Sequence, residues 1–170
     1  MFSVNDCVVY GSSGVMRIVD ITKQFVGGEE REYFVLANVF GTADSKTFVP
    51  VDNEKLVRSM RHVMTKEEMA RALSETCLPD VPWVKDTRAR NERFRLIIES
   101  GDVPLMISML KTIKETERQR LIDGKNPFVT DTLALQKAVR ILCSEISLSF
   151  SVEEPCAMDI LRENCPFFDD

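Results

Sequence analysis

The chain has 170 residues, with 22 Lys and Arg against 27 Asp and Glu, so its formal net charge is −5. This acidic total argues against a protein that coats nucleic acid through bulk charge, and a hydrophobic fraction of 44% excludes a wholly disordered chain. The apolar runs are far shorter than the ~20 residues that span a bilayer, and no signal-peptide pattern opens the chain, so we expect a cytoplasmic protein without a membrane segment.

The charge is distributed unevenly along the chain. Residues 1–59 carry a net charge of −2, residues 60–151 carry +2, and residues 152–170 carry −5. The acidity therefore lies almost entirely in the last 19 residues. The mildly basic middle segment leaves room for a local basic face despite the negative total.

The first 58 residues predict β-structure. Segments rich in Val, Ile and Phe alternate with turns that contain Gly, and no helical periodicity interrupts them. The predicted strands are 6–10, 15–26, 33–40 and 46–51, and the turns between them are 11–14, 27–30 and 41–44. Four or five short strands joined by tight turns predict a small antiparallel β-barrel over residues 1–58.

After Val57 the hydrophobic period changes to that of helices. Thr65 and Glu68 have the spacing of a capping box, Gly101 is a helix terminator, and Asp102 can cap the helix that follows it. Either Thr130 or Asp131 is expected to cap a further helix. The predicted helices span about 65–76, 83–100, 102–123 and 130–150, with a short one around 157–164.

We therefore predict an α+β fold. A small antiparallel barrel at residues 1–58 is followed by a short linker near 59–64 and by a compact all-helical domain of four to five helices at 64–151. The remaining segment, 152–170, is an acidic tail that can either fold onto the helical domain or compete with DNA for its basic groups.

Enzyme signatures are absent from the sequence. There is no P-loop, no dinucleotide-binding glycine motif and no helical zinc-protease motif. The five cysteines include no CxxC pair, and His62 is the single histidine, so a Cys/His zinc cluster is improbable. We expect no catalytic residue, no metal, no small-molecule cofactor and reduced thiols.

Trp83, the single tryptophan, is the most informative residue of the helical region. Basic side chains follow it at Lys85, Arg88, Arg90 and Arg93. An exposed indole beside basic groups can wedge or stack at a DNA base step while Lys and Arg hold the phosphates. The alternative is a core aromatic on one face of the predicted helix, and from the residues alone this is slightly favoured.

A second group of basic residues follows in the next predicted helix. Lys111, Lys114 and Arg118 share one helical face, and Lys125 lies beyond them. They form either a phosphate-contact stripe or an ordinary solvated face, since Glu115 and Glu117 are interspersed.

Taken together, these segments resemble the CarD family of bacterial transcription regulators. The N-terminal part is also similar to the RNA-polymerase-interacting domain of transcription-repair coupling factor. The family opens with a pattern like F-x-x-G-D-x-V-V-Y-P-x-x-G-V, and residues 2–15 read FSVNDCVVYGSSGV. Further matches, in the family's order, are YFVL at 33–36, FVPV at 48–51, Trp83, ESGD at 99–102 and AVRILCSEI at 138–146.

The resemblance implies a Tudor-like barrel that binds the RNA polymerase β subunit by extending a β-strand pairing. It also implies a helical domain that contacts promoter DNA at the upstream edge of the transcription bubble, where a tryptophan at the position of Trp83 wedges into the minor groove. The implied DNA-contacting residues are Trp83, Lys85 and Arg88, with Arg90, Arg93, Lys111, Lys114 and Lys125 as weaker candidates. The implied polymerase-contacting positions are Lys23, Gln24, Lys46 and Phe48.

The sequence departs from the family pattern at several positions. Asn5 and Gly11 replace the usual Gly and Pro, and both residues tolerate turn conformations. Asp86 stands where a basic residue is common, which would weaken DNA binding. We expect a monomeric regulator that stabilises the promoter open complex; the alternative is a protein-only adaptor on RNA polymerase, whose helical domain binds a protein partner.

Overall fold

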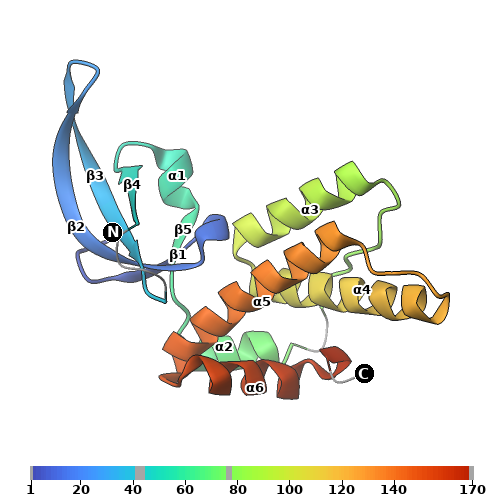
Figure 1. The fold of residues 1–170 in the computed structure, drawn as a ribbon. Helices are drawn as coiled ribbons and strands as arrows, with labels where there is room; N and C mark the ends of the chain where they lie inside the picture. The colour runs from blue at the N-terminus through green and yellow to red at the C-terminus, as the bar shows by residue number, and fades with distance from the viewer. Residues whose placement is uncertain (1, 41–44, 76–77, 169–170) are drawn as a thin grey trace. The chain divides into compact units, whose positions relative to one another are not determined.

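The computed structural model describes residues 2–40, 45–75 and 78–168, and it divides the chain into two compact units, Met1–Val63 and Met64–Asp170. The N-terminal unit is built on one antiparallel sheet with the strand order β4-β3-β2-β1-β5 (Figure 1). Its elements are β1 (Cys7–Tyr10), η1 (Gly11–Ser13), β2 (Val15–Val26), β3 (Glu29–Asn38), β4 (Lys46–Pro50), α1 (Glu54–Arg58) and β5 (Met60–His62). The sheet ends at β4 and β5 and is open among the described residues, so the predicted barrel closure is not observed.

Alternating side chains of this sheet form a small core. Ile18, Leu36 and Val49 are fully buried and come from three neighbouring strands. Beyond this core, β2 and β3 continue as a hairpin whose two turn residues, Gly27 and Gly28, have φ of 65° and 89°. These positive angles are what a two-residue hairpin turn requires and explain why glycine occupies both positions. The hairpin end therefore projects from the core as an exposed ribbon.

Two short elements of this unit were not predicted. Helix α1 has five residues and begins where the Asn53 side chain accepts a hydrogen bond from the Leu56 amide at 3.2 Å. Strand β5 falls in the expected linker and pairs antiparallel with β1, opposing Tyr10 with Met60. Neither element is long enough to show a hydrophobic period. The predicted turn at 41–44 lies outside the described residues.

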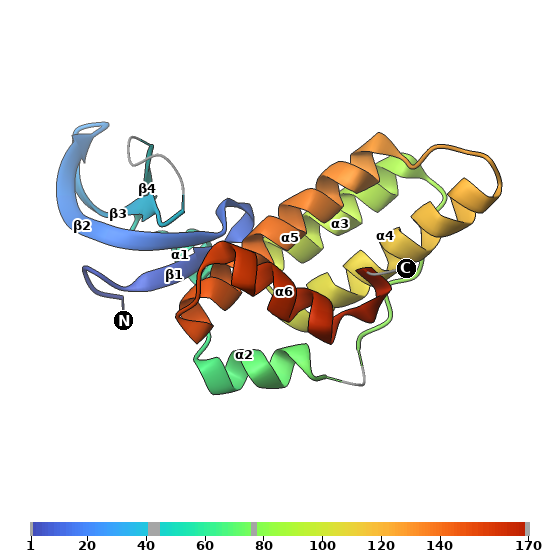
Figure 2. The ribbon, with the colours of Figure 1, turned by 60° about the horizontal axis from the view of Figure 1, so that its bottom comes forward.

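The C-terminal unit is entirely helical, which confirms the α+β class (Figures 1 and 2). Its elements are α2 (Lys66–Leu73), α3 (Thr87–Ser100), α4 (Val103–Ile122), α5 (Val129–Phe150), α6 (Glu154–Asn164) and η2 (Pro166–Phe168). One apolar cluster joins the α-helices of this unit, and its fully buried members include Met69, Met106, Ile113 and Leu142. None of the described helices is both long and apolar enough to cross a membrane.

The capping signals placed most helix ends correctly. Thr65 and Glu68 form the predicted capping box, Asp102 caps α4, and Gly101 ends α3 with a φ of 66°. The start of α3 was wrong by four residues: Asp86 caps it by accepting a hydrogen bond from the Ala89 amide at 2.7 Å. Trp83 therefore lies before the helix, in a segment without regular structure. It does not share a helical face with the buried side chains of α3, as the sequence predicted.

The start of α5 also differs from the prediction. Its N-cap is Phe128, whose side chain accepts no capping hydrogen bond, and neither Thr130 nor Asp131 caps it. Asp131 instead lies inside the helix and is 2% exposed. A carboxylate in that position must be compensated by a partner.

The described part of the acidic segment, residues 152–168, folds onto the other helices. Helix α6 packs along α5, and Ala157, Leu161 and Cys165 are fully buried in the common core (Figure 2). The acidic side chains lie on the outer side of α6; Glu153, Glu154, Asp159 and Glu163 are exposed. The charge of this segment is therefore part of the helical unit.

Because Leu161 is fully buried, we expect Leu161→Ala to lower the free energy of unfolding of the helical unit by about 2–5 kcal/mol. Urea unfolding followed by the fluorescence of Trp83, the only tryptophan, reports on this unit. Glu163→Ala, at an exposed position of the same helix, is the matched control and should change the value by less than about 0.5 kcal/mol. Equal, small effects of both substitutions would show that α6 is not part of the core.

Candidate nucleic-acid interface

Trp83 is partly buried and lies against Phe128, the residue that precedes α5. The two rings are stacked, with centroids 5.8 Å apart and an interplanar angle of 27°. Trp83 thus contacts a residue 45 positions away in the chain, whereas the sequence predicted neighbours on its own helix. Trp83 packs on the edge of the helical core, and Phe128 is partly buried against it.

Arg90 joins this stack from inside the unit. Its guanidinium carbon is 4.1 Å from the centre of the Trp83 ring and 4.8 Å from that of Phe128, which are cation–π distances. Its Nε donates a hydrogen bond to Asp131 Oδ1 at 3.0 Å, and its Nη1 donates to the carbonyl oxygens of Val84 and Lys85 at 2.8 and 3.2 Å. The predicted role of Arg90 as a DNA contact is therefore corrected: the side chain is 1% exposed and its charge is compensated internally.

The last turn of α4 also contacts the stack through Arg120. Arg120 places its guanidinium carbon 3.8 Å from the centre of the Phe128 ring and donates from Nε to the Asn126 carbonyl at 2.8 Å. Lys125 is exposed in the loop that follows α4, with the carboxylate of Asp123 3.8 Å from its Nζ. The sequence placed Arg120 only after the basic face of Lys111, Lys114 and Arg118, because no spacing links it to Trp83.

Three predicted contacts follow Trp83 in the chain: Lys85 before α3, and Arg88 and Arg93 within it. Lys85 and Arg88 are exposed and Arg93 is partly exposed. Their side chains form no hydrogen bond or ion pair with a residue in the described part of the chain. Asp86 is also present here, but its carboxylate is occupied as the N-cap of α3. The exposed cations of Lys85 and Arg88 are therefore available for phosphate groups.

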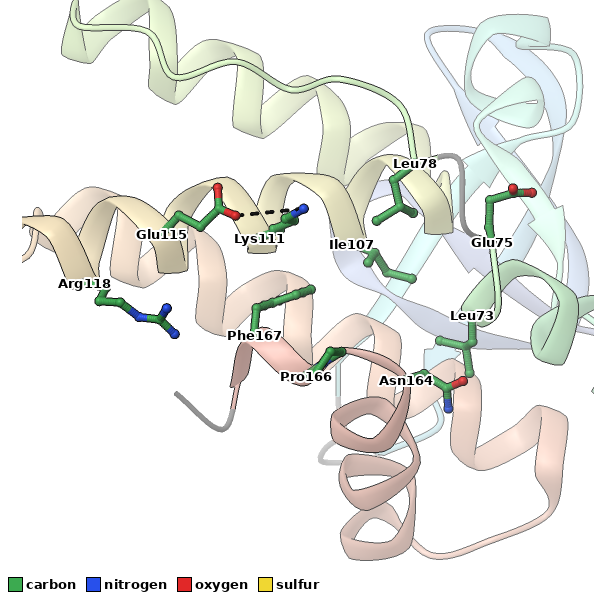
Figure 3. A pocket seen from close by; sticks show the side chains of 10 residues that line it. All are labelled: Leu73, Glu75, Leu78, Ile107, Lys111, Glu115, Arg118, Asn164, Pro166 and Phe167. Atoms are coloured by element: carbon green, nitrogen blue, oxygen red, sulfur yellow. Dashed lines mark ion pairs between the residues drawn. The ribbon is translucent and has the colours of Figure 1, made fainter.

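Lys111 and Lys114 have other surroundings. Lys114 is partly buried with Glu117 at 3.9 Å, and Lys111 lies 3.9 Å from Glu115. Lys111 also lines a cavity of about 540 Å³ between α4, the end of α2 and the C-terminal turn, where Figure 3 shows it across from Phe167. The other lining residues are Leu73, Glu75, Leu78, Ile107, Glu115, Arg118, Asn164 and Pro166. None of the lining residues belongs to the stack around Trp83, so the structure does not join Lys111 to that group.

The predicted polymerase-contacting positions fall on two different parts of the sheet. Lys46 and Phe48 lie on the edge strand β4, where Phe48 is 44% exposed and its ring packs edge-on against Tyr33. Lys23 and Gln24 lie in the projecting part of the hairpin, where Lys23 pairs with Glu30 at 3.1 Å. An edge strand offers unpaired backbone groups to a partner strand, whereas the hairpin offers only side chains.

The buried thiols do not have the properties of nucleophiles. Loss of hydration raises the pKa of both Cys143 and Cys165 to about 11, so each is protonated at neutral pH. Within the described residues, no group of three or more His, Cys, Asp or Glu side chains is arranged to hold a metal ion. The stack around Trp83 is therefore the candidate site that the geometry favours.

Loss of the charge on Asp131 would leave the Arg90 guanidinium buried without its anionic partner. We expect Asp131→Asn to lower the free energy of unfolding by about 3–5 kcal/mol. The matched control is Asp123→Asn, since that carboxylate is exposed and only loosely paired; its effect should stay below about 1 kcal/mol. Denaturant unfolding of both variants makes the comparison, and a small effect at Asp131 would contradict a structural ion pair.

Comparison with known families accounts for the N-terminal unit. Residues 2–64 match the family model described as the CarD-like/TRCF RID domain. These residues coincide with the unit that the fold delimits, Met1–Val63. The resemblance drawn from the strand motifs is therefore confirmed over this region. The N-terminal unit is a CarD-like/TRCF RID domain, which connects the protein with transcription and with RNA polymerase.

Proposed function

We propose that this protein is a non-enzymatic transcription regulator. Its N-terminal unit binds the RNA polymerase β subunit, and its helical unit stabilises the promoter open complex by contacting DNA at the upstream edge of the bubble. The proposal is carried by the aromatic stack of Trp83 and Phe128, in a chain whose first unit is a CarD-like/TRCF RID domain. Lys85 and Arg88, which follow Trp83 in the chain, are exposed and form no ion pair within the described residues. We expect the protein in the cytoplasm, where it would bind RNA polymerase.

Strand addition at β4 is the proposed mode of polymerase binding. This strand pairs on one side with β3 and is at the end of the sheet on the other. Phe48 projects from it as an exposed apolar anchor beside Tyr33. Helix α1 follows β4 and precedes β5, an arrangement that fits a Tudor-like barrel whose ends it would bridge.

DNA contact is proposed at the Trp83 end of the helical unit. The partly buried indole, held against Phe128, presents a rigid aromatic group that can wedge or stack at a DNA base step. Lys85, Arg88 and Arg93 follow Trp83 in the chain, Arg120 in the last turn of α4 contacts Phe128, and Lys125 lies in the loop before α5. A site that binds melted DNA better than duplex shifts the promoter toward the open state by its difference in affinity.

Tethering makes a small DNA site sufficient. The helical unit from residue 64 onward carries 15 basic and 19 acidic groups, so its net charge is −4. Such a unit is not attracted to free DNA by its total charge. When the N-terminal unit holds it on polymerase, the effective concentration of the DNA site is in the millimolar range, and few contacts suffice.

We expect Trp83→Ala to shorten the lifetime of the open complex by roughly tenfold relative to the wild type, because one base–aromatic stack is lost. Competitor-challenged decay of polymerase–promoter complexes, with and without the protein, measures this.

Lys85→Ala and Arg88→Ala should each lower the slope of log affinity against log salt by about one. Arg95→Ala is the matched control, since Arg95 is held by Glu92 and Glu99, both at 2.6 Å. A Trp83→Ala lifetime equal to that of the wild type would exclude the proposal.

A protein-only adaptor is the second candidate function, and one surface favours it. Large apolar side chains are exposed where α4 ends and α5 begins, next to Phe128. They are Leu121, Ile122, Val129 and Leu133, each between 59% and 74% exposed. Exposed apolar groups gathered in this way are typical of protein interfaces.

Leu133→Glu separates the two functions. If the helical unit binds a protein, this change should abolish the effect on transcription, while Lys85→Ala leaves it intact and salt has little influence. If the helical unit binds DNA, the opposite pattern is expected, with Leu133→Glu close to the wild type. Decay of open complexes at low and high salt, measured for both variants, gives the answer.

A further inference from the structure

We propose that Arg90, from inside the helical unit, is the positioning residue for Trp83. In this role the guanidinium holds the indole in the orientation that meets DNA and does not itself touch the nucleic acid. The inference rests on the proposed DNA contact of Trp83. It reassigns a residue that the sequence grouped with the phosphate-binding cations.

Trp83 needs such a support because no regular structure orients it. Residues 78–84 form neither helix nor strand, and α3 begins only at Thr87. The segment is tied to α4 at two points upstream of the tryptophan: the Ser108 hydroxyl donates to the Pro79 carbonyl, and the Thr112 hydroxyl donates to the Val81 carbonyl at 2.6 Å. These bonds hold the backbone before Trp83 and leave the ring and the following residues to other contacts.

Arg90 supplies those contacts with one planar group. Its guanidinium lies against the Trp83 ring at 4.1 Å, and its Nη1 holds the carbonyls of Val84 and Lys85, the two residues that follow. Nε is bound to Asp131 on α5, so the group cannot turn away. A lysine ammonium is a compact point charge that cannot reproduce the stacking and the divergent hydrogen bonds together.

Burying the Arg90 guanidinium costs free energy of hydration, and the stability of the fold alone does not require this cost. Arg90 is 1% exposed, and its Nη2 is buried without a hydrogen-bond partner among the described residues. Buried ion pairs can often be replaced by apolar residues of similar volume without loss of stability. A charged group kept here with one nitrogen unsatisfied is therefore better explained by the geometry it imposes on Trp83.

The positioning role is tested first without DNA. Because Trp83 is the only tryptophan, quenching of its fluorescence by acrylamide reports its exposure directly. We expect Arg90→Lys to raise the quenching constant about twofold or more, since the cation–π contact and the carbonyl bonds are lost. Arg95→Lys, at an exposed position of the same helix, should leave it unchanged. Arg90→Met, always combined with Asp131→Leu so that no buried carboxylate loses its partner, gives a second measurement if the lysine variant folds poorly.

The same variants are then assayed for open-complex lifetime. We expect Arg90→Lys or Arg90→Met to shorten it by roughly threefold or more, toward the value of Trp83→Ala. The combined variant Trp83→Ala/Arg90→Met, which also carries Asp131→Leu, should be no worse than Trp83→Ala, because Arg90 acts only through the indole. A merely structural role would instead add its loss to that of Trp83→Ala.

The outcomes separate the inference from the proposed function. If Trp83→Ala shortens the lifetime but the Arg90 variants do not, or if quenching is unchanged in both Arg90 variants, the positioning role is wrong and the DNA contact stands. If Trp83→Ala leaves the lifetime unchanged, the proposed function fails, whatever the quenching shows. Additive losses in the combined variant would also overturn the positioning role.

Discussion

The ion pair between Arg90 and Asp131 is the interaction on which the candidate site depends. It joins α3 to α5 at residues 41 positions apart, and both side chains are nearly inaccessible to solvent. Removing one partner from such a pair leaves an uncompensated buried charge, so the two side chains persist together or not at all. The rings of Trp83 and Phe128 pack on the same guanidinium, so the aromatic stack depends on this charge pair.

Local signals in the sequence predicted the helix ends well where a cap is encoded within a few residues. The capping box at Thr65, the cap at Asp102 and the glycine at 101 are of this kind. The prediction failed where a coincidental period extended a helix, since Trp83 happens to continue the spacing of the buried side chains of α3. It also failed for β5, because a three-residue strand exists only through its pairing with β1.

The contacts of the site could not be predicted from the sequence, because they join residues that are distant along the chain. In the sequence, Arg90 shares a helical face with Phe94 and Ile97, which is a sign of burial. It was nevertheless grouped with Lys85 and Arg88, because all three are basic residues that follow the same tryptophan. Its burial is set by Asp131, a distant residue that the sequence suggested as a helix cap. Conversely, Arg120 lies in the last turn of α4 and reaches the stack only through its contact with the Phe128 ring. The strand motifs, which are local, identified the N-terminal domain correctly.

The fold also changes what the net charge means. Divided along the sequence, the charge suggests a basic helical body with a separate acidic tail. In the structure α6 is built into the core through Leu161, so the acidic side chains of α6 are held on the unit that carries Trp83. A unit with a net charge of −4 gains little from long-range attraction to DNA, which salt screens within about 10 Å. Its proposed contact must therefore come from short-range stacking and a few adjacent cations, which is why a preformed orientation of Trp83 matters more here than charge.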